Sequence, residues 1–155
     1  MPTDAAPLPE PRYIVNVEVA IVRGDRYLLI VRGAGETHAP GTLSLVGGKV
    51  EAVGAVEDVL EEALRREVAE EVGLTLAAPL RYVRSTAFVA DDGELVVDVV
   101  FLARCDGGEP VIRDPAEVAA IRWLTAPEVA ADPDAPPWTR RSVELAERLR
   151  LTQGW

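Results

Sequence analysis

The chain has 155 residues, of which 48% are hydrophobic and 27% are charged, and its formal net charge is −10. This length and balance indicate a globular chain with a sizeable core. The negative charge argues against duplex nucleic acid or an anionic membrane as the main partner, because both bind basic surfaces.

Cysteine and histidine are too scarce for several kinds of site. The single Cys105 excludes an intramolecular disulfide and fits a reducing compartment. With only one histidine beside it, a zinc site of His and Cys ligands is nearly excluded. The N-terminal sequence lacks the basic start and apolar segment of a signal peptide, and no apolar run is long enough to cross a bilayer. We therefore expect a cytoplasmic protein.

The first part of the chain predicts a tail followed by a hairpin. Four prolines in residues 1–11 predict a disordered tail, and we expect a single domain over residues 12–155. Residues 13–22 are rich in β-branched side chains and predict a strand. A turn at Gly24-Asp25 then leads into a returning strand over residues 27–32.

A glycine pair follows the hairpin and a loop over residues 33–41. Residues 43–46 form a short apolar segment that leads into Gly47-Gly48, and a second short segment follows at residues 49–51. Adjacent glycines allow a positive φ and let a backbone carbonyl approach a ligand closely. The alternative is a plain turn.

The longest predicted helix covers residues 58–72. This stretch contains no Gly or Pro and is dominated by good helix formers, and Gly73 stands where a helix would end. Leu60, Ala63 and Leu64 are three and four residues apart, so they form one apolar face.

Two carboxylates continue this apolar face, and a third lies beside them. Its register runs on to Glu67 and Glu71, and Glu70 lies beside them. Carboxylates three and four residues apart repel one another, and these lie near the negative end of the helix macrodipole. A divalent cation would relieve both effects, since hard oxygen ligands suit Mg²⁺ or Mn²⁺. The alternative is a solvated acidic surface.

Residues after this helix predict further strands. Strands over 81–89 and 94–104 are joined by a turn at 91–93, and a last strand covers 118–124. Asp98 interrupts the apolar run of its strand. It therefore has a partner or a function, or it lies on the solvent face of an edge strand.

The C-terminal part predicts two helices. A short helix opens at residues 126–128, a rigid spacer covers 132–137, and Thr139 caps a last helix over 140–150. Hairpin strands combined with a few helices predict an α+β fold, with the helices packed on the faces of a sheet.

The stretch from residue 48 to residue 74 resembles the Nudix box. That signature of the MutT-like Nudix hydrolase family begins with Gly, five residues, Glu and seven residues. It continues as Arg-Glu-hydrophobic-any-Glu-Glu-any-Gly-hydrophobic, and this second half is matched at every defined position by Arg66-Glu67-Val68-Ala69-Glu70-Glu71-Val72-Gly73-Leu74. The resemblance covers roughly residues 12–130. It implies the Nudix fold, an α/β/α sandwich with a mixed sheet.

The chain departs from the signature in its first half. Asp58 stands at the position of the middle Glu, and the loop between Glu51 and Asp58 is four residues longer than the signature. An insertion in a loop has a small entropic cost. Leu43 and Val46 replace a frequent tryptophan and proline. These differences concern base recognition more than metal chemistry.

The resemblance implies roles for individual residues. The metal ligands would be Glu67, Glu70, Glu71 and the carbonyl of Gly48, with Mg²⁺ or Mn²⁺ as the cofactor. Arg66 would hold a helix carboxylate by a charged hydrogen bond. The predicted catalytic set is therefore Glu70, Glu67 and Arg66.

The general base and the substrate contacts are less defined. The base is Glu70 or Glu67 within the box, or Glu117 or Asp98 outside it. Glu51 would support the loop or the metal shell, while Arg32 and Lys49 would contact phosphate or remain solvated surface groups. The predicted substrate-binding residues are Arg32, Lys49, Glu51, Asp98 and Glu117.

Three functions follow from the resemblance. The first is metal-dependent hydrolysis of a diphosphate bond in a small nucleotide-like molecule, such as a nucleoside triphosphate or ADP-ribose. The second is a non-catalytic nucleotide-binding Nudix domain. The third is an isoprenoid diphosphate isomerase, which would need Cys105 at the site. A homodimer is one option for the oligomeric state, and we expect Trp138 and Trp155 to be packing groups.

Overall fold

A computed structural model describes residues 10–51 and 54–155. Residues 1–9 of the predicted tail and residues 52–53 of the extended loop lie outside this part. The described chain forms a seven-stranded sheet and three helices: β1 (Tyr13–Arg23), β2 (Arg26–Arg32), β3 (Leu43–Ser44), β4 (Val46–Lys49), α1 (Val59–Val72), β5 (Leu76–Val89), β6 (Leu95–Cys105), β7 (Val118–Thr125), α2 (Ala126–Ala131) and α3 (Pro137–Gln153).

The sheet is mixed, and one edge of its central strand β1 pairs with two different strands. One edge of β1 pairs in parallel with β6, which continues to β5. The other edge is shared between two antiparallel neighbours, because Asn16 to Val19 pair with β4 whereas Val22 and Arg23 pair with β2. β2 continues to β3 and β7. The change of neighbour from β4 to β2 leaves room for a cavity.

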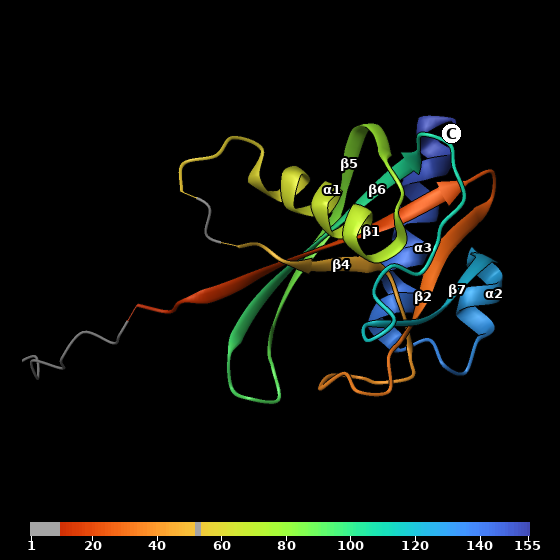
Figure 1. The fold of residues 1–155 in the computed structure, drawn as a ribbon. Coiled ribbons are helices and arrows are strands. Elements are labelled where there is room, and N and C mark those ends of the chain that lie inside the picture. The colour runs from red at the N-terminus through yellow and green to blue at the C-terminus, as the bar shows by residue number, and fades with distance from the viewer. Residues whose placement is uncertain (1–9, 52–53) are drawn as a thin grey trace, which may run out of the picture.

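Side chains of β1 alternate between two cores. Its odd-numbered apolar residues pack with Leu64 and Val68 of α1, whereas its even-numbered ones pack with Val143 and Ala146 of α3. Figure 1 shows α1 and α3 on opposite faces of the sheet. The predicted α/β/α sandwich with a mixed sheet is therefore confirmed. Within the described ranges, none of the helices has the length and hydropathy that a bilayer crossing requires.

The predicted start of β5 is wrong. The strand begins at Leu76 rather than at Arg81, and Pro79 lies inside it. The pairing with β6 shifts register between Ala77 and Arg81. Proline has no N–H to donate, so a strand accepts it at an edge or an irregularity, and β5 offers both.

The predicted cap of the last helix is also wrong. α3 begins at Pro137, and Pro136 occupies the N-cap position. Proline suits the first helical turn, because the N–H that it lacks has no partner there. Thr139 lies inside the helix, and its hydroxyl donates to the carbonyl of Leu43 at 3.1 Å. The residue thus links α3 to β3.

Candidate functional site

The glycine pair lies within strand β4 and not in a turn. Neither Gly47 nor Gly48 has a positive φ. A Cβ atom on Gly48 would lie 2.5 Å from Cδ of Glu67, and one on Gly47 would lie 2.0 Å from the carbonyl oxygen of Val17. Both positions therefore require glycine for close approach, and the carboxylate of Glu67 packs directly against the backbone of β4.

Arg66 ties the middle of α1 to the end of β4. Its guanidinium donates to Oε1 of Glu67 at 3.0 Å and to the carbonyl of Lys49 at 3.3 Å. A third contact reaches Oε2 of Glu51 at 3.5 Å. Glu67 is thus fixed from two sides, by Arg66 and by Gly48. The contact with Glu67 is the one that the resemblance implies, while the catalytic role of Arg66 stays a prediction.

A cavity of about 340 Å³ opens where the neighbour of β1 changes. It brings together most of the predicted site residues, from β2, β4, α1 and the segment before β7. Its lining comprises Asn16, Glu18, Ile30, Arg32, Glu36, Ser44, Leu45, Gly47, Gly48, Lys49, Glu51, Glu67, Glu71 and Glu117. Arg66, Glu70 and Asp98 do not line it. We call it the carboxylate cavity.

Glu71 is a buried carboxyl group with an incomplete set of partners. Only 5% of the residue is exposed, and its Oε2 atom has no hydrogen-bond partner. Burial, together with the neighbouring carboxyl group of Glu117, raises the pKa of Glu71 to about 9. Burial also raises the pKa of Glu67, against the opposing effect of Arg66. Holding these carboxyl groups in their ionised form therefore costs free energy.

The donor set of the carboxylate cavity fits a divalent cation. In the described part of the chain, no three His, Cys, Asp or Glu side chains form a ready-made metal-binding group. The oxygen atoms nevertheless suit a hard cation, since Glu71 presents a buried acceptor without a donor and Glu67 lies against Gly48. Glu70 is far more exposed than Glu67, with 62% of its side chain exposed against 14%.

A second acidic pair joins a residue of the cavity wall, Glu18, to Asp98, which does not line the cavity. Asp98 is buried on β6, between β1 and β5, so the edge-strand alternative is wrong. Its Oδ1 accepts a hydrogen bond from Nδ2 of Asn16 at 2.7 Å. Burial and the neighbouring Asp98 raise the pKa of Glu18. The sequence did present a signal for Asn16 and Glu18, because both are polar residues at alternate positions of an apolar strand.

Three aromatic side chains form a cluster centred on His38. The ring of His38 stacks with Phe88 at a centroid distance of 6.4 Å and with Trp138 at 6.0 Å. Trp138 is 53% exposed, so it is not the packing group that was expected. Arg32 lines the cavity and donates to the carbonyl of His38 at 2.9 Å. We call these three residues the aromatic cluster. By contrast, Trp155 packs against the α3 core as expected.

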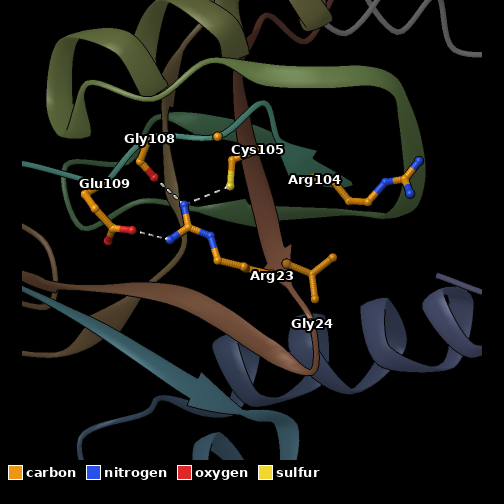
Figure 2. A pocket seen from close by; sticks show the side chains of 8 residues that line it. Arg23, Gly24, Arg104, Cys105, Gly108 and Glu109 are labelled. Atoms are coloured by element: carbon orange, nitrogen blue, oxygen red, sulfur yellow. Dashed lines mark hydrogen bonds and ion pairs between the residues drawn. The ribbon is translucent and has the colours of Figure 1, made fainter.

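A larger cavity of about 500 Å³ lies at the other end of β1. Figure 2 shows Arg23 crossing it toward Gly108, Cys105 and Glu109. The guanidinium contacts Sγ of Cys105 at 3.2 Å and pairs with Glu109 at 3.0 Å. None of the box acids lines this cavity. Cys105 is therefore not beside them, as the isomerase alternative would require.

Comparison with known proteins agrees with this geometry. A family model described as the NUDIX domain matches residues 12–146. A MutT NUDIX hydrolase from Burkholderia pseudomallei is 30% identical, with a TM-score of 0.73 over 86% of this chain and 98% of that one. A search of curated proteins found no match.

More distant structures share the fold. A MutT protein from Methanosarcina mazei Go1 is 23% identical, with a TM-score of 0.74 over 92% of this chain and 98% of that one. A UDP-X diphosphatase is 19% identical, with a TM-score of 0.66 over 94% of this chain and 65% of that one. The domain match spans most of the sequence, including the strands and the helix that form the carboxylate cavity. The chain therefore belongs to the Nudix family of pyrophosphohydrolases.

Proposed function

We propose that this protein hydrolyses a diphosphate bond in a nucleoside diphosphate-linked small molecule, by attack of water on phosphorus with the help of a divalent cation. The observation that carries the proposal is the buried carboxyl group of Glu71, which lacks a donor at Oε2 and shares the carboxylate cavity with Glu117. A purely structural group would have a cationic partner in this position.

The family generally uses divalent metal cations, and we propose Mg²⁺ or Mn²⁺ here. Glu67, Glu70, Glu71 and the carbonyl of Gly48 would hold the cation. When bound, it would neutralise the diphosphate and lower the pKa of the attacking water. Glu67 and Glu71 line the cavity, whereas the exposed side chain of Glu70 lies outside its lining, 4.0 Å from Nε of Arg66.

Other residues of the cavity would bind and orient the phosphate groups. Arg32 is held by Glu36 at 2.9 Å, which fixes its guanidinium at the cavity wall. Lys49 lines the same wall. Glu117 also lines the cavity, which supports it over Asp98 as a base from outside the box. Glu67 and Glu70 stay candidates for that role.

We propose that the nucleoside part of the substrate uses the aromatic cluster. Any nucleobase can stack on an aromatic side chain, because every base has a π-face. The exposed ring of Trp138 would provide this contact. Asn16 and Glu18 provide polar groups in the adjoining cavity. These residues would compensate for the aromatic residue that is absent at Leu43.

The test is a substrate panel with Mg²⁺ or Mn²⁺. Nucleoside triphosphates, ADP-ribose, UDP-linked sugars, dinucleoside polyphosphates and NADH are incubated with the protein, and the phosphate products are measured. We expect turnover of at least one compound, its loss in Glu67→Gln, and little change in Glu62→Gln, an exposed position on the same helix.

Two results would contradict the proposal. The first is that no compound in the panel is hydrolysed with either cation. The second is turnover that survives in Glu67→Gln as well as in the matched control. Tight nucleotide binding without turnover would instead favour the non-catalytic Nudix domain. The cytoplasmic location, the homodimer and the single domain over residues 12–155 stay predictions.

A further inference from the structure

The segment between β6 and β7 is fastened to the last turn of α1. The N–H of Val111 donates to the carbonyl of Val72 at 3.0 Å, and the N–H of Arg113 donates to that of Glu71 at 3.0 Å. Helix C-termini leave such carbonyls without intrahelical partners. These two hydrogen bonds hold the segment against the end of α1, four residues before Glu117.

A second attachment joins this segment to the end of β2. The N–H of Gly33 donates to the carbonyl of Glu117 at 2.8 Å. A Cβ atom on Gly33 would lie 2.1 Å from the carbonyl oxygen of Ala116. Gly33 has no positive φ, so the close approach of the two backbones is the reason for glycine here.

A turn at Asp114 fixes the backbone conformation at Ala116 and Glu117. Oδ1 of Asp114 accepts from the N–H groups of Ala116 at 3.1 Å and Glu117 at 3.4 Å. The pairing of β2 with β7 also shifts register between Val31 and Arg32, beside this turn. Such irregularities redirect side chains next to functional sites.

We propose that Gly33 is a positioning residue, which sets Glu117 in the wall of the carboxylate cavity that Glu71 also lines. It acts through the backbone of Ala116 and Glu117 and touches neither substrate nor cation. The inference rests on the proposed function, in which Glu117 serves the reaction centre. Because Gly33 lies outside the Nudix box, the box sequence alone does not specify this part of the site.

The test compares two glycines of one loop. Gly33→Ala places a methyl group against Ala116, whereas a Cβ atom on Gly35 meets no atom within 4 Å. We expect Gly33→Ala to lower kcat and the affinity for Mn²⁺ of the substrate-free protein by about tenfold each, the scale for residues that orient metal-site groups. Gly35→Ala should leave both unchanged.

A double-mutant cycle shows whether Gly33 acts through Glu117. Glu117→Gln should reproduce the loss of Mn²⁺ affinity, and adding Gly33→Ala to it should cause no further loss. Fully additive effects would overturn the proposal. So would a Gly33→Ala protein that folds normally and matches Gly35→Ala in kcat and in Mn²⁺ affinity.

A second variant keeps the proposal testable if Gly33→Ala does not fold. Asp114→Ala releases the same turn from its other side, and Asp114→Asn keeps one acceptor oxygen and should restore Mn²⁺ affinity. If Asp114→Ala binds Mn²⁺ as tightly as the wild-type protein, the proposal is wrong. If the wild-type protein hydrolyses nothing, the proposed function fails, while the Mn²⁺ titrations still decide the role of Gly33.

Discussion

Two glutamates on opposite faces of the sheet have opposite environments. Glu147 on α3 accepts from Tyr27 at 2.6 Å and from two guanidinium nitrogens of Arg150, each at 2.8 Å. The hydrogen bonds from Arg150 lower its pKa. Glu71 on α1 has an acceptor without a donor, and burial beside Glu117 raises its pKa to about 9.

This difference separates a structural carboxylate from a candidate ligand. On the α3 face, the charge of Glu147 has a cationic partner and a neutral donor. On the α1 face, the carboxyl groups instead face one another, and Arg32 is the main opposing charge acting on Glu71. A local conflict of this kind in an otherwise well-packed fold marks a functional position.

The largest expected effect concerns hydrolysis. Glu71→Gln removes a negative ligand from the carboxylate cavity, so we expect kcat to fall by about a thousandfold, the equivalent of roughly 4 kcal/mol of transition-state stabilisation. Glu147→Gln should change kcat by less than about twofold, because Glu147 contacts only structural groups. Steady-state rates at saturating cation measure both. Equal losses in the two variants would remove the distinction between the faces.

The aromatic cluster provides a smaller effect on the same reaction. Trp138→Ala should raise KM for a nucleotide substrate by about tenfold, since stacking of one base contributes roughly 1–3 kcal/mol. Leu151→Ala is the control on α3, because Leu151 is also exposed and lies at the other end of that helix. A change in kcat alone, or an equal change in both variants, would argue against a base-binding role.

Much of the fold could be predicted because its signals are local. The helix from Val59 to Val72 has helical composition, an apolar face in its first half and a terminal glycine, and all three are visible in the sequence. The start of β5 is not predictable locally, because Pro79 breaks strands in most contexts. The edge position of β5 and its register shift between Ala77 and Arg81 permit the proline there. Thr139 was misread because its partner, Leu43, is distant in the sequence.

The candidate site shows the same division. The box gives Glu67 and Glu71 directly, because their spacing on one helix places them together. Glu18 and Asp98 meet only because β1 and β6 pair in parallel, which pairs Glu18 with Val100 and its neighbour Asn16 with Asp98. No local pattern encodes that register. The aromatic cluster likewise combines a loop, a strand and a helix.

The two glutamates should also differ in their effect on stability. Glu71→Gln replaces a buried, repelled carboxyl group by a neutral amide of similar shape, so we expect the free energy of unfolding of the metal-free protein to rise by about 1–3 kcal/mol. Urea unfolding in EDTA measures this change. A loss of stability would show that the acid of Glu71 is structurally required, and it would contradict the assignment as a ligand.

The smallest effect is the pH dependence of the α3 face. The folded-state pKa of Glu147 is lowered, so its contribution to stability is present above the unfolded-state pKa and is lost as pH falls through the folded-state pKa. Glu147→Gln should therefore lower the free energy of unfolding by about 1 kcal/mol at pH 7. Glutamine has no proton to bind, so the difference between wild type and variant should shrink as pH falls below about 4.5. Urea titrations at several acidic pH values measure this convergence. A difference that stays constant down to pH ~3 would mean that Glu147 stabilises the fold by packing rather than by its charge.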